Sequence, residues 1–160
     1  KMKIEGKNPE TGEAFQAEAS DIDSEFIDSL LNIDMSDESL KRFIDNLEWS
    51  ADAKSSLYSF SKATIVVGNQ IIKIGRKILD IVCLIYKEFP LVTFGTICGA
   101  LIGLLISAIP ILGIVLGPIF TPIAMALGLI VGTVAETGNK LLDSKIHEIA
   151  ASFHPLNVSL

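Results

Sequence analysis

The sequence has little of what catalytic and nucleic-acid-binding proteins need. Its 160 residues include only two cysteines and two histidines, and aromatic residues make up 7%. Lysine and arginine number 13 against 19 acids, a net charge of −6. A nucleic-acid partner calls for a clustered basic face, which this charge balance argues against.

No catalytic or metal-binding pattern emerges. His147 and His154 are the only histidines, and neither belongs to a paired Cys/His ligand set. Cys83 and Cys98 lie in apolar surroundings, which favours reduced packing residues over a disulfide or redox pair. No GxxxxGK[ST] loop occurs. We therefore expect a protein that is not an enzyme and that holds no cofactor or metal.

Charge is absent from one long stretch. No charged residue lies between Glu88 and Glu136, so 89–135 form an uncharged run of 47 residues. A bilayer core takes about 20 helical residues, so this length favours two spans and a turn within 110–122. Two alternatives stay open. The run is a buried core, or a soluble form hides the hairpin and inserts it later.

Charge also divides the chain. Residues 1–50 hold 13 acids and 5 bases, whereas 51–160 hold 6 acids and 8 bases. The acidic part predicts a short β-hairpin or arm with a turn near Asn8–Gly12, then two amphipathic helices, the second capped by Ser36. Ser50 begins a predicted long amphipathic helix over 51–89.

These patterns predict an all-α membrane protein with four parts. They are the acidic arm and helices (1–50), the long amphipathic helix (51–89), a transmembrane hairpin (90–135) and a C-terminal amphipathic helix with a tail (136–160). Basic residues flank the hairpin on both sides: Arg76, Lys77, Lys87, Lys140 and Lys145. By the positive-inside rule we expect an integral protein of the inner membrane with both termini in the cytoplasm.

Small residues recur every fourth position in the uncharged run. The set proposed for helix packing and oligomerisation is Gly95, Gly99, Gly103, Ser107, Gly128 and Gly132. In lipid, small residues let helix backbones approach closely, so the pattern predicts either contact within one hairpin or a homo-oligomer. Hydroxyl side chains are the candidate pore-lining groups: Thr93, Thr96, Ser107, Thr121 and Thr133. The alternative for each is a bond to its own helix.

The predicted hairpin together with its exit, ALGLIVGTVAETGNKLLDSKIHEI, resembles the hydrophobic helical hairpin of pore-forming colicins. In that family an uncharged, glycine- and alanine-rich helix pair leads into a charged amphipathic segment. The likeness covers about a third of the chain and lies in pattern only. A colicin pore domain is also a larger bundle, with about ten helices. The resemblance implies an inserting hairpin, ion conduction and a toxin role.

Two functions follow from these expectations. The first is a homo-oligomeric pore that permeabilises or depolarises a membrane, as a toxin, a holin-like factor or a defence effector. The second is a membrane-anchored adaptor whose acidic N-terminal helices recruit a protein partner. The expected partners are membrane lipid, further copies of the chain and a basic protein.

Overall fold

The computed structural model describes residues 2–129 and 136–160. Over these residues the chain forms seven α-helices and a four-stranded antiparallel sheet. In chain order the elements are β1 (Met2–Lys7), β2 (Ala14–Ala19), α1 (Ser24–Leu31), α2 (Asp37–Asp45), α3 (Ala51–Ser61), β3 (Ile65–Val67), β4 (Gln70–Ile72), α4 (Ile74–Glu88), α5 (Phe94–Ala108), α6 (Pro110–Ala126), α7 (Lys140–Ala151) and a 3₁₀ turn, η1 (His154–Leu156).

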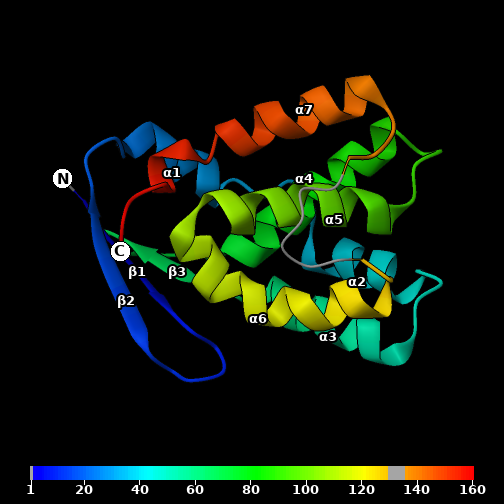
Figure 1. The fold of residues 1–160 in the computed structure, drawn as a ribbon, viewed down its shortest axis with the longest axis horizontal. Helices are drawn as coiled ribbons and strands as arrows, with labels where there is room; N and C mark the ends of the chain where they lie inside the picture. Colours follow the sequence, from blue (N-terminus) through cyan, green and yellow to red (C-terminus); the bar gives the residue numbers. More distant parts are fainter. Residues whose placement is uncertain (1, 130–135) are drawn as a thin grey trace.

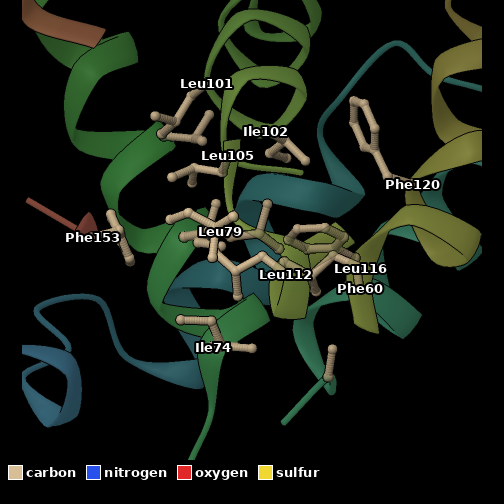
Figure 2. Close-up of a cluster of buried hydrophobic side chains, with 14 of the residues drawn as sticks. Phe60, Ile74, Leu79, Leu101, Ile102, Leu105, Leu112, Leu116, Phe120 and Phe153 are labelled. Carbon is tan, nitrogen blue, oxygen red and sulfur yellow. The ribbon is translucent and has the colours of Figure 1, made fainter. Parts of the chain in front are cut away.

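Of the two uncharged, apolar helices, α5 lies at the centre of the molecule and α6 packs against it (Figure 1). In Figure 1, α4 and α5 run through the middle, with α7 along one side and α6 with α3 along the other. The sheet closes one end of this helical layer. Figure 2 shows Leu101 and Leu105 of α5 converging with Leu79 of α4 and Leu112 of α6. These side chains are buried, and each such burial contributes about 1.5–3 kcal/mol.

The expectation of an all-α membrane protein is wrong. The fold is mixed α/β, and no helix in the described residues combines the length with the hydropathy that a bilayer crossing requires. With 15 and 17 residues, α5 and α6 are about 22 and 25 Å long, against a hydrocarbon core of about 30 Å. The expectations of a transmembrane hairpin, an inner-membrane location and a pore-forming protein therefore lose their basis.

The predicted long helix over 51–89 is also interrupted. It forms α3, the β3–β4 hairpin and α4 instead. Gly68 has φ +62° between β3 and β4, the left-handed conformation that two-residue hairpin turns require. Because the chain reverses here, α3 packs on α6 while α4 packs on α5. As two separate helices, α3 and α4 cover both α5 and α6 with apolar side chains, which one continuous helix over 51–89 does not do.

The predicted helix caps at Ser36 and Ser50 are confirmed. The Ser36 hydroxyl accepts from the Ser39 backbone N–H at 3.1 Å, and the Ser50 hydroxyl accepts from the Ala53 N–H at 3.2 Å. Each hydroxyl satisfies one of the N–H groups that have no partner within the first turn.

The sheet has the strand order β2-β1-β3-β4. The turn between β1 and β2 is built on Asn8, whose side-chain oxygen accepts from the backbone N–H groups of Glu10 and Thr11. Ile4 of β1 pairs with Val67 of β3, and both side chains are buried. The sheet therefore contributes its inner face to the same core as the helices.

A buried ion pair joins α4 to the segment before α2. Asp80 accepts from the backbone N–H groups of Asp34 and Met35 at 3.1 and 2.8 Å. Arg76, one turn earlier, donates to the Met35 carbonyl and, at 3.3 Å, to the Asp37 carboxylate. Arg76 was expected to be a membrane-flanking base, but only 6% of its side chain is exposed. Its charge is balanced inside the protein instead.

We expect Gly75→Ala to destabilise the fold by about 2–3 kcal/mol. A Cβ at this position would lie 1.8 Å from the Phe60 carbonyl oxygen, a backbone atom that cannot move without displacing the end of α3. Urea unfolding followed by circular dichroism measures the loss. Gly95→Ala is the matched control, because its Cβ would meet side-chain atoms alone, with a Leu127 methyl group nearest at 3.3 Å. Equal stability of both variants would contradict this account of the α3–α4 contact.

Candidate functional site

The predicted packing glycines contact side chains of the same chain. A Cβ on Gly95 would meet Leu127, and a Cβ on Gly99 would meet Leu129 at 2.7 Å. Gly128 follows the end of α6 with φ +72°, and Gly103 is buried in α5. Gly132 lies outside the described residues. Self-association stays a prediction, and the contacts of Gly95 and Gly99 within one chain remove the reason first given for it.

The candidate hydroxyl groups bond close to their own positions. Thr93 caps α5, accepting from the Thr96 N–H at 3.2 Å, and the two hydroxyls lie 2.8 Å apart. Ser107 donates to the Gly103 carbonyl at 2.7 Å, and Thr121 donates to the Gly117 carbonyl at 2.9 Å. Thr133 lies outside the described residues.

Three of the five flanking bases lie together around a groove. Lys77 and Lys87 come from α4, and Lys145 comes from α7. Lys140, at the start of α7, is exposed and does not line the groove. Arg76 faces a different pocket, at the start of α4. The structure thus separates a group of residues that the sequence placed on one membrane surface.

The groove lies between α1, α4 and α7 and has a volume of about 580 Å³. Its apolar lining comes from all three helices and from the second residue after α7: Phe26, Leu30, Ile81, Leu84, Ile85, Ile149 and Phe153. Leu84 is 42% exposed, and Ile81 and Ile149 are half-buried. A concave apolar surface open to solvent is typical of binding sites.

The rim of the groove is positively charged. Lys145 Nζ lies 2.6 and 2.7 Å from the two Glu88 carboxylate oxygens and links α7 to α4. Lys77 donates to the Asn32 carbonyl at 2.6 Å and makes no ion pair with any of the residues that the structure describes. Lys87 makes no ion pair in the described part of the chain. Three lysines and one glutamate give this site a net charge of +2 on a protein whose net charge is −6.

Sequence reasoning identified the apolar stripe of α1 but not the groove that it lines. Phe26 and Leu30 belong to that stripe, and we expected it to be covered. The groove forms where α4 and α7 both contribute side chains, and these two helices are more than 50 residues apart in the sequence. The sequence signal that could have indicated the groove is Leu84, a large apolar residue on the otherwise polar face of α4.

Neither histidine gathers metal-binding partners. His147 Nδ1 lies 2.8 Å from the Asp143 carbonyl oxygen, and His154 begins the 3₁₀ turn η1. Within residues 2–129 and 136–160, no three His, Cys, Asp or Glu side chains are placed to hold a metal ion.

The two cysteines lie in the core. Both are free and fully buried. Burial, with a smaller contribution from the Asp80 charge, raises the pKa of the Cys83 thiol to about 12. Burial also raises the pKa of Cys98 well above its ordinary value. Both thiols therefore stay protonated at neutral pH, and the protonated form is not the nucleophile.

We expect both cysteines to resist alkylation in the native protein up to about pH 9, and to react fully in denaturant. A raised pKa means that the thiolate forms only at higher pH, so reactivity should rise as pH increases. Mass spectrometry after iodoacetamide treatment counts the modified residues. Rapid native labelling of either cysteine at pH 7 would contradict the core assignment.

Comparisons with protein families, with curated proteins and with solved structures found no match to this chain.

Proposed function

We propose that this protein is a non-catalytic protein-binding module, and that the groove between α1, α4 and α7 receives an amphipathic helix of a partner. The observation that carries this proposal is the groove itself, an open apolar surface with a net positive rim on an acidic protein. It keeps the adaptor function and drops the membrane anchor, since no described helix is able to cross a bilayer.

The shape of the groove favours a helical partner. The lining residues of α4 recur every three or four positions and therefore form one face of the helix over three turns. They are Lys77, Ile81, Leu84, Ile85 and Glu88. The eleven residue steps from Lys77 to Glu88 rise by about 16 Å. A partner helix of similar length, lying along α4 between α1 and α7, places its apolar residues at i, i+4 and i+7 against this face. Its burial of Leu84 and Ile81 supplies the main gain in free energy.

The rim favours acidic residues on the partner helix. Lys87 and Lys77 carry charges that no carboxylate within the described residues balances. Aspartate or glutamate on either side of the apolar stripe pairs with them. Because exposed pairs contribute about 0–1 kcal/mol each, the charges select the partner and its orientation more than they add affinity.

A second candidate contact is the acidic surface of residues 1–50, which suits a basic partner. Of its 13 acids, 12 are exposed. Ion pairs among the described residues engage Glu5, Asp37 and Asp45. The remaining carboxylates attract a basic protein over a distance set by ionic strength. This contact predicts binding that weakens steeply with salt, whereas binding in an apolar groove depends on salt less.

A peptide library displayed on phage tests the proposal on the full chain. Selection on wild-type protein should enrich helical peptides with apolar residues at i, i+4 and i+7 flanked by Asp or Glu. Leu84→Asp should weaken their binding at least tenfold, because it places a carboxylate in the apolar floor. Leu141→Asp is the matched control: Leu141 is 77% exposed on α7 and does not line the groove.

Two outcomes would overturn the groove. One is equal binding of the selected peptides to wild type and to Leu84→Asp. The other is enrichment of Lys- and Arg-rich peptides whose binding is lost with salt, which would favour the acidic surface instead. Lys87→Glu adds a further check, because it should reverse the preference for acidic flanks while the variant keeps its circular dichroism spectrum.

A further inference from the structure

A second pocket lies on another part of the molecule, where α2, the end of α3 and the start of α4 meet. Its volume is about 440 Å³. Four bases line it, Lys41, Lys62, Lys73 and Arg76, against a single acid, Asp37. Four of the 13 basic residues of this acidic chain therefore converge on one pocket. Lys41 and Arg76 are paired with nearby carboxylates, so Lys62 and Lys73 supply the excess positive charge. Such a concentration attracts anions.

Some hydrogen-bond donors of the pocket already have partners within the protein, and others do not among the described residues. Lys41 pairs with Asp45 at 3.0 Å, and the Tyr58 and Ser61 hydroxyls donate to groups of α2 and α3. Lys62 and Lys73 are exposed and make no ion pair within the described part of the chain. These two ammonium groups are thus available to a ligand.

Arg76 lines this pocket with a side chain that is only 6% exposed. Its Nη1 is fully buried, finds no hydrogen-bond partner among the described residues, and lies 3.8 Å from an oxygen of Asp80, which is not part of the pocket lining. On the outer side Arg76 Nε meets the Asp37 carboxylate at 3.3 Å, yet the Asp37 side chain is 97% exposed. An anion entering from solvent is able to replace that contact.

The start of α4 adds to the same field. This helix has 15 residues, its N-cap is Lys73, and no side chain caps it. Its first turn contains no acid. The Gly75 N–H of the first turn donates to the Ala63 carbonyl at 3.2 Å, so the helix start contributes the positive end of its dipole, close to Lys73 and Arg76 of the pocket lining.

We propose that this pocket binds a phosphate group, either as free orthophosphate or as a small phosphomonoester. A phosphate dianion offers several acceptor oxygens in different directions, which suits charged donors that come from Arg76 and from two lysines. A carboxylate presents two oxygens in one plane and uses fewer of these donors. Leu40 and Tyr58 form a less polar wall beside the bases, which leaves room for the organic part of an ester.

Thermal unfolding of the full chain with increasing inorganic phosphate, and separately with phenyl phosphate, tests the site. Phosphate should raise the melting temperature with saturation in or below the millimolar range, as binding to the folded state requires. The double variant Lys62→Gln/Lys73→Gln should bind phosphate more weakly and raise the half-saturation concentration about tenfold. Both lysines are exposed, so this variant keeps the fold. Arg76→Lys is a second variant, and its own stability is measured first because Arg76 also holds Met35.

Lys140→Gln is the matched control, since Lys140 is exposed on α7 and lies outside the pocket. It should respond to phosphate as the wild type does. Tighter binding of phenyl phosphate would support an ester, and tighter binding of orthophosphate would support the free ion. An equal response to sodium chloride at matched ionic strength would overturn the site, because it would show screening alone. So would an unchanged response in the double lysine variant.

Discussion

Covering α5 and α6 is the constraint on which the rest of the structure depends. Neither helix carries a charged side chain, and both bury residues on most of their faces. The neighbouring elements therefore have to present apolar faces: α3 to α6, α4 and α7 to α5, and β1 of the sheet to α6. Gly6 of β1 shows how close this packing is, since a Cβ there would lie 2.6 Å from a Val115 methyl group.

The Arg76–Asp80 pair answers a second need, which is to hold the acidic segment on this core. The backbone between α1 and α2 has N–H and carbonyl groups that no helix or strand satisfies. Two side chains of α4 bind these groups: Asp80 accepts from the N–H groups of Asp34 and Met35, and Arg76 donates to the Met35 carbonyl. Because each charge is buried, loss of either partner leaves the other uncompensated, a cost of about 3–5 kcal/mol. The same arginine then serves as the inner wall of the proposed phosphate pocket.

Much of the local structure was predictable. The caps at Ser36 and Ser50 and the apolar stripe of α2 follow from spacing, because a cap and a stripe depend only on residues within a few positions of each other. The β3–β4 hairpin was missed, although Val66-Val67-Gly68-Asn69 carries the signal of β-branched residues before a two-residue turn. The apolar periodicity of the segments before and after Gly68 favours a continuous helix, whereas Gly68 itself favours a turn.

The sequence alone determined that α5 and α6 must be kept from water, since an uncharged, apolar helix has no polar face. It did not determine what covers them. Hydropathy measures the same tendency in lipid and in a protein core, and the choice depends on whether distant segments complement those helices in shape. Tertiary packing decided this, and it also gathered the bases. Lys77, Lys87 and Lys145 now rim one groove, while Lys62, Lys73 and Arg76 line another pocket. Their spacing along the chain carries no information about that division.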